Sequence, residues 1–215
     1  MVDNWKYLGV SFNRLANFLP HIKNLKSQVA NKQAALLSFY ARNHFNSISL
    51  HTKLYHSLLY FCMLYAAPMW AWSRLGELEA MQNKYFHRLL LLPYQTPTYL
   101  IYAELGLYPI KFKLTKCTFN FWCRLKTLRA DSSALFWFNH CLLNPLQKAN
   151  HLSAFIEIIG PELNPQTSLN CLSEQDIQEL QVRVHARELA NNWHAIQQKL
   201  LTPSFTPIMH NLESN

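Results

Sequence analysis

The chain has 215 residues, a formal net charge of +8 and a hydrophobic content of 50%. This composition excludes an intrinsically disordered chain, and four Gly against ten Pro disfavour a turn-rich β fold. Residues 1–129 hold 16 Lys and Arg against four Asp and Glu, whereas residues 130–215 hold four against eight. Between residues 4 and 76 there are eight basic residues and no acidic one. Such a segment attracts phosphate backbones, unless it is a solvated basic face without a ligand.

The N-terminal part of the chain predicts a short hairpin followed by a long helix. Strand-forming residues surround Gly9 in WKYLGVS, which indicates a strand or short hairpin within residues 5–12. Pro20 then begins a helix predicted over residues 20–43. Its apolar stripe at helical spacing consists of Ile22, Leu25, Val29, Leu36 and Tyr40.

Two further helices are predicted over residues 49–67 and 75–92. Ser47 or Ser49 supplies the N-cap of the first, and Pro93 stops the second. The apolar stripe of the second consists of Leu78, Met81, Tyr85 and Leu89.

The run from Leu54 to Ser73 contains no Lys, Arg, Asp or Glu, and its 20 residues are long enough to span a membrane. Three Tyr lie inside the run rather than only at its ends, where an aromatic belt would place them. The pattern therefore favours a buried core helix that ends near Pro68.

Residues 111–129 predict a basic helix that is also rich in aromatic residues. The aromatic side chains are those of Phe112, Phe119, Phe121 and Trp122. Interleaved aromatic and basic residues bind single strands by stacking and charge. Helical spacing favours the other interpretation, in which the aromatic rings are core and the Lys and Arg extend outward.

The C-terminal part predicts one more long helix, over residues 174–200, beginning at a capping box from Ser173 to Asp176. Its expected apolar face consists of Leu189, Trp193, Ile196 and Leu200. Residues 160–170 are interpreted as a loop and residues 202–215 as a loose tail.

The sequence offers no catalytic or metal-binding constellation. Its three Asp, at positions 3, 131 and 176, are far apart, whereas two-metal nucleotide transfer needs carboxylates that converge on both ions. Glu77 and Glu79 point to different sides of a helix and are interpreted as solvated. Five Cys form no CxxC pair, so a zinc site and a disulfide framework are both disfavoured. We expect no catalytic residues, no metal and no cofactor.

Three segments follow one another along residues 5–130. WKYLGV at residues 5–10 precedes a basic helix and then LYHSLLYFCMLYAAPMW at residues 54–70. The third and most specific segment contains Gln82-Asn83-Lys84, Arg88, Pro93, Thr96-Pro97, Glu104-Leu105-Gly106 and Pro109. In order and spacing, the three resemble the region after the polymerase core in non-LTR (LINE, jockey-like) retrotransposon reverse transcriptases. Ala66-Ala67-Pro68 departs from the usual Tyr-Gly step, which leaves the end of that helix open.

This resemblance implies a helical thumb that holds primer and template, with WKYLGV similar to the primer grip. Residues 1–130 would be the primer-grip and thumb-like region, and residues 131–215 a C-terminal helical region with a loose tail. The expected fold class is mainly α, a helical thumb-like bundle with at most a short N-terminal β-hairpin. The palm and its aspartates would lie upstream of Met1. The chain would then be a non-catalytic remnant of an RNA-directed DNA polymerase.

The expected function is sequence-nonspecific binding of an RNA–DNA or DNA duplex, because phosphate contacts carry no base information. The candidate contacts are Lys6, Tyr7, Lys23, Lys26, Lys32 and Arg42. The basic members come from the acid-free segment, where no neighbouring carboxylate is expected to compete. Lys6 and Tyr7 match the primer grip, although Tyr7 fits a core residue of the hairpin equally well.

One alternative function stays open. The chain also fits a helical interaction or structural protein whose basic half binds an acidic protein partner. No signal peptide is recognisable, so an intracellular location, in the cytoplasm or the nucleus, is expected.

Overall fold

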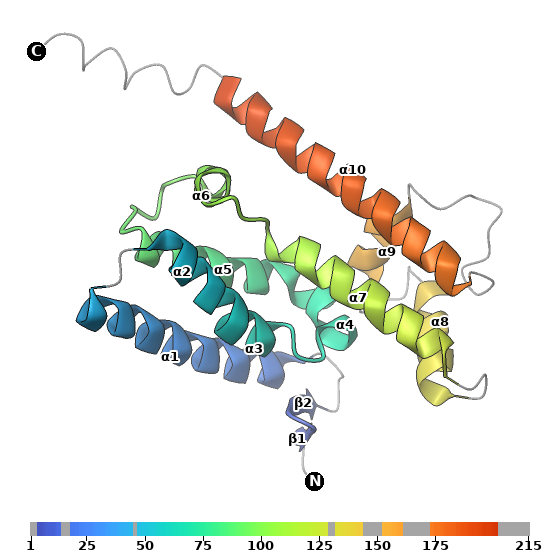
Figure 1. Ribbon diagram of the computed structural model, residues 1–215. Helices are drawn as coiled ribbons and strands as arrows, with labels where there is room; N and C mark the ends of the chain where they lie inside the picture. The colour runs from blue at the N-terminus through green and yellow to red at the C-terminus, as the bar shows by residue number, and fades with distance from the viewer. Residues whose placement is uncertain are drawn as a thin grey trace, which may run out of the picture.

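The computed structural model describes residues 4–13, 18–44, 47–128, 132–143, 152–160 and 173–201. Within them the protein is mostly helical, with one two-stranded antiparallel sheet at its N-terminal end (Figure 1). The predicted fold class, mainly α with a short N-terminal hairpin, is confirmed.

The hairpin consists of β1 (Asn4–Tyr7) and β2 (Val10–Asn13). Leu8 and Gly9 form its two-residue turn with φ of 44° and 85°, the left-handed conformation that matches the twist of the strands. A Cβ at Gly9 would also lie 3.3 Å from the Tyr65 ring, so this position favours glycine twice over. Val10 and Ser11 are buried where β2 contacts α1.

Helix α1 (Leu19–Asn43) begins beside Pro20, as predicted, and buries the whole expected apolar stripe. The chain then turns back along α1 through α2 (Ile48–Tyr55), the π-helical turn η1 (His56–Tyr60) and α3 (Phe61–Met63) (Figure 1). Ser47 is the N-cap of α2, since its side chain accepts a hydrogen bond from the amide of Leu50.

The predicted continuous helix over residues 49–67 is wrong at its C-terminal end. The helix stops at Met63, and α4 (Ala67–Trp70) starts a new one. Ala66 has a left-handed φ of 50°, which breaks the run of helical hydrogen bonds. Pro68 therefore lies in the first turn of α4, where a missing amide N–H costs little.

The next elements follow their local signals closely. They are the 3₁₀ turn η2 (Ala71–Arg74), α5 (Leu75–Leu89), α6 (Thr98–Leu105) and α7 (Ile110–Lys126). Pro93 lies in the loop after α5, Gly106 ends α6 with φ of 61°, and Pro109 caps α7. Helix α5 ends short of the predicted residue 92 because Leu91 adopts a left-handed φ of 52°.

The C-terminal region contributes α8 (Ser133–Leu143), α9 (Ser153–Ile159) and α10 (Glu174–Leu201). The predicted capping box is confirmed. Asp176 Oδ2 accepts a hydrogen bond from the Ser173 amide at 2.8 Å, and Ser173 Oγ accepts one from the Asp176 amide at 3.2 Å. The predicted loop at residues 161–170 and the tail at 202–215 lie outside the described residues.

The expected apolar face of α10 needs correction. Its buried side chains are those of Ile177, Leu180, Val184 and Ile196. Trp193 is 59% exposed, Leu189 is half-buried, and the side chain of Leu200 is outside the described part of the chain. The reason is coverage: α7 and α9 pack against α10, which extends well beyond them (Figure 1).

The core is a single cluster of buried side chains, with α5 packed between α1 and α7. Phe112, Phe119 and Trp122 are buried, which confirms that most aromatic rings of α7 are core; Phe121 is half-buried. Residues from both predicted regions join this cluster, although their division at residue 130 stays a prediction. Of the helices in the described ranges, none is long and apolar enough to cross a membrane.

Candidate nucleic-acid interface

The four cations expected on α1 do not share one surface. At 3.6 residues per turn, Lys26 and Lys32 flank the buried stripe on opposite sides, and Arg42 points away from it. Lys23 and Arg42, both exposed, are also about five turns apart along the helix. Helix α1 thus spreads its positive charge around its circumference.

Lys26 is paired with an acid, contrary to expectation. Its Nζ lies 2.8 Å from Glu77 Oε2, and Arg74 approaches the same carboxylate at 3.3 Å. The prediction that no carboxylate competes was based on the absence of acids up to residue 76, but α5 brings Glu77 alongside α1. Glu77 is correspondingly an ion-paired residue rather than a merely solvated one. Lys32 Nζ instead contacts Cys62 Sγ of α3.

The hairpin presents Lys6 and Tyr7 on opposite faces, because successive side chains alternate along a strand. Tyr7 is 67% exposed and is therefore not a core residue of the hairpin. Lys6 lies on the Ser11 side, near His21. Burial lowers the pKa of His21, and the charge of Lys6 lowers it further.

A wide groove of about 1670 Å³ lies between the C-terminal half of α1, the start of α2, α5 and the loop that leads to α6. Its lining includes two cations four residues apart on α5, Lys84 and Arg88, together with His44 and His87. Glu79 is the carboxylate among the lining residues, and burial raises its pKa, while Lys111 partly offsets that rise. We call this the α5 groove.

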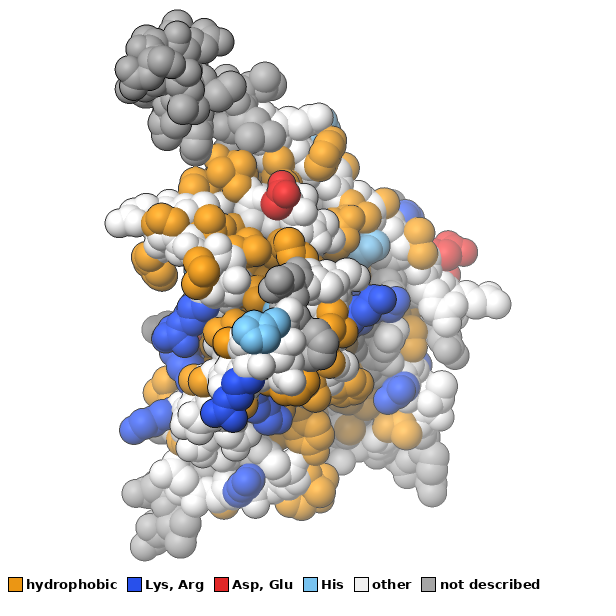
Figure 2. Space-filling view, turned by 60° about the vertical axis from the view of Figure 1, so that its left-hand side comes forward, with side chains coloured by type: hydrophobic (Ala, Val, Ile, Leu, Met, Phe, Trp, Pro, Cys, Tyr) orange, Lys and Arg blue, Asp and Glu red, His pale blue; other side chains and the backbone are white. Residues whose placement is uncertain are grey.

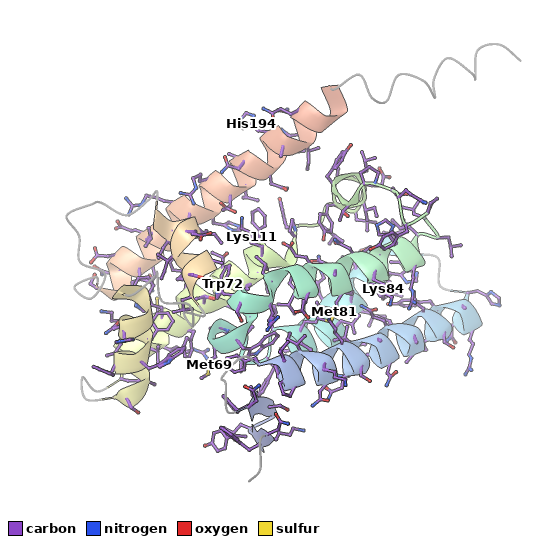
Figure 3. All side chains as sticks on the ribbon, turned by 180° about the vertical axis from the view of Figure 1, so that it is seen from behind. Met69, Trp72, Met81, Lys84, Lys111 and His194 are labelled. Atoms are coloured by element: carbon purple, nitrogen blue, oxygen red, sulfur yellow. The ribbon has the colours of Figure 1, made fainter. Side chains whose placement is uncertain are left out.

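Two views place this groove at one end of the molecule. Figure 2 brings that end forward and shows Lys and Arg side chains spread over it, with few Asp or Glu. In Figure 3, Lys84 lies on the stretch of α5 that runs beside α1, close to Met81. The Met81 carbonyl accepts a hydrogen bond from Gln33 of α1 at 3.0 Å, which fixes the two helices at this point.

Buried polar contacts hold the walls of the α5 groove in place. His87 Nδ1 forms a 3.1 Å hydrogen bond with the Pro93 carbonyl, which keeps the following loop against α5. Asn83 accepts a hydrogen bond from the Tyr102 hydroxyl of α6. Gln82 donates to Tyr60 Oη and to the Tyr108 carbonyl, both at 3.1 Å. Gln82 and Asn83 therefore position neighbouring elements, whereas Lys84 and Arg88 are exposed.

Lys84 and Arg88 were not among the predicted contact residues. Their spacing at i and i+4 places them on one helical face, and that signal was available in the sequence. Charge counting favoured the acid-free segment instead. Among the described residues, no three His, Cys, Asp or Glu side chains gather where they would hold a metal ion.

Comparison with protein-family models, curated proteins and solved structures finds no significant match to this chain.

Proposed function

We propose that this chain is a sequence-nonspecific nucleic-acid-binding module that holds a duplex, RNA–DNA or DNA, against the α5 groove. The observation that supports this function is the pair Lys84 and Arg88, which lie exposed on one helical face along a groove rimmed by His44. Two cations one turn apart make contact with consecutive phosphates of one strand, and such contacts carry no base information. His44 would add positive charge when protonated.

The resemblance to non-LTR reverse transcriptases supports the same proposal. The segment that carries the most specific part of the resemblance, residues 82–109, supplies Lys84, Arg88 and the loop wall of the groove. On this proposal the chain is a thumb-like remnant of an RNA-directed DNA polymerase that binds primer and template without extending them. Primer extension that disappears when a residue of this chain is replaced would contradict the proposal.

The direct test is binding of an RNA–DNA hybrid, measured by fluorescence anisotropy over a range of salt concentrations. Each phosphate contact contributes about 0.9 to the slope of log affinity against log salt. Lys84→Ala/Arg88→Ala should therefore reduce that slope by about 2. Lys113→Ala/Lys116→Ala removes two exposed charges from α7 and should leave the groove's contribution to the slope unchanged.

A second variant separates the groove from the outer surface of α1. If Lys23→Ala/Lys26→Ala/Lys32→Ala lowers the slope more than the α5 pair does, the nucleic acid lies on α1 and the groove assignment is wrong. Absence of binding at low salt would remove the function altogether.

A further inference from the structure

A second groove, on the opposite edge of α1 from the α5 groove, is almost entirely apolar. It has a volume of about 470 Å³ and is lined by Lys32, Ala35, Leu36, Phe39, Leu54 and Leu58. The first four residues come from α1, and the last two from α2 and η1, which run back along α1. We call this the α1–η1 groove.

The rim of the α1–η1 groove keeps large apolar side chains in solvent. Phe39 is 48% exposed, Leu58 is 50% exposed and Phe61, one turn beyond Leu58, is 77% exposed. Apolar side chains gathered in a groove between two helices form the kind of surface that receives a third helix.

The charge around this groove has one sign. No Asp or Glu occurs between residues 4 and 76, so α1, α2, η1 and α3 present no carboxylate at all. Lys32 lies in the groove lining, and Arg42 continues the line of Ala35 and Phe39 at spacings of i+7 and i+3. Ten residues of helix separate Lys32 from Arg42, which corresponds to about 15 Å.

We infer that the α1–η1 groove binds an acidic amphipathic helix of a partner protein. Such a helix places apolar side chains at i, i+4 and i+7 between Phe39, Leu54 and Leu58. About three turns of it reach from Lys32 to Arg42, so Asp or Glu flanking the apolar stripe meet both cations. A basic or neutral helix of the same shape lacks this complementarity. The surface is separate from the α5 groove, so the inference does not depend on the proposed nucleic-acid binding.

The test uses the full chain and fluorescent peptides of about 18 residues, long enough to be helical when bound. One peptide carries Leu at i, i+4, i+7 and i+11 with Glu on both flanks; a second has Lys in place of Glu; a third is a scrambled version of the acidic peptide. The acidic amphipathic peptide should bind at least about tenfold more tightly than the other two. Equal binding of the scrambled peptide would overturn the inference.

Variants locate the binding. Leu58→Ser should weaken binding of the acidic peptide by about tenfold, and Phe136→Ser, at a 73% exposed position on α8, is the matched control that should not. Lys32→Glu/Arg42→Glu should reverse the preference in favour of the Lys peptide, and this surface change remains informative should Leu58→Ser reduce folding. Self-association of the chain that Leu58→Ser abolishes would assign the groove to a second copy instead, and would likewise overturn the inference.

Discussion

The Tyr65 hydroxyl donates a 2.7 Å hydrogen bond to the Leu8 carbonyl, across 57 residues of sequence. This bond ties the tip of the hairpin to the turn between α3 and α4. Beneath it, the ring of Tyr65 covers Gly9. Tyr65→Phe keeps that ring and removes only the hydrogen bond. We expect it to cost about 1 kcal/mol or less, because the bond is exposed to solvent. Amide hydrogen exchange should accelerate in residues 4–13 and stay unchanged in α7; equal protection in both proteins would show that the hairpin is held by packing alone.

A second prediction concerns the buried hydrogen bond from Trp72 Nε1 to Thr118 Oγ1, at 2.9 Å (Trp72 is labelled in Figure 3). Thr118→Val leaves the indole N–H without its acceptor in the core, and should lower the free energy of unfolding by about 1–3 kcal/mol. Thr115→Val is the matched control, because Thr115 Oγ1 bonds to the carbonyl one turn earlier in its own helix. Urea unfolding should show a clearly larger loss for Thr118→Val, and equal losses would count against the importance of this bond.

Stability should fall as the pH falls below about 6.5. Burial lowers the folded-state pKa of both His21 and His56, and the nearby charges of Lys6 and Lys113, respectively, lower them further. The unfolded chain then binds more protons than the folded chain between the ordinary pKa of about 6.5 and the lowered values. This contribution is fully present above about pH 6.5 and is lost as the pH falls toward the folded pKa values.

Urea unfolding between about pH 7.5 and about pH 5.5 measures this loss. Lys6→Gln removes the cation near His21, so its profile should be shallower than that of the unmodified chain. A profile of the same steepness in the variant would show that Lys6 does not influence His21.

The pairing of Lys26 with Glu77 makes Glu77 a restraint on nucleic-acid binding. Glu77→Gln removes a negative charge and releases both Lys26 and Arg74 from their shared carboxylate. We expect tighter binding of an RNA–DNA hybrid at low salt and a steeper salt dependence, by up to about one phosphate contact. The stability cost should be within about 1 kcal/mol, since these ion pairs are partly exposed. Unchanged affinity would place the nucleic acid far from this pair.

Local signals in the sequence were sufficient for most helix boundaries. Pro93, Gly106 and Pro109 act on the backbone of their own turn, so their effect does not depend on the rest of the fold. The Ser173–Asp176 capping box is equally local. The end of the helix at Met63 was missed because Ala66 carries no signal for its left-handed conformation, which the packing of α3 and α4 imposes.

Contacts between elements could not be derived in this way. The apolar stripes of α1 and α5 were predicted residue by residue, yet their relative rotation decides that Lys26 meets Glu77 and that Lys84 faces the groove. Trp193 shows the same limit. The amphipathic pattern of α10 is real, but only contact with α7 and α9 determines how far along the helix it is used. Charge counting along the chain likewise could not separate Lys32 and Arg42, beside an apolar groove, from Lys84 and Arg88.

The π-helical turn η1 makes the length of its helix a structural requirement. A π turn accommodates one residue more than an α turn, so the five residues from His56 to Tyr60 set the rotation of everything that follows. Removing one of them would restore α geometry and turn Tyr60 and Met63 by about 100°. Tyr60 would then leave Gln82, and Met63 would leave Tyr55. Ser57 is exposed and tolerates replacement, but its deletion should unfold the contact between this helix and α5.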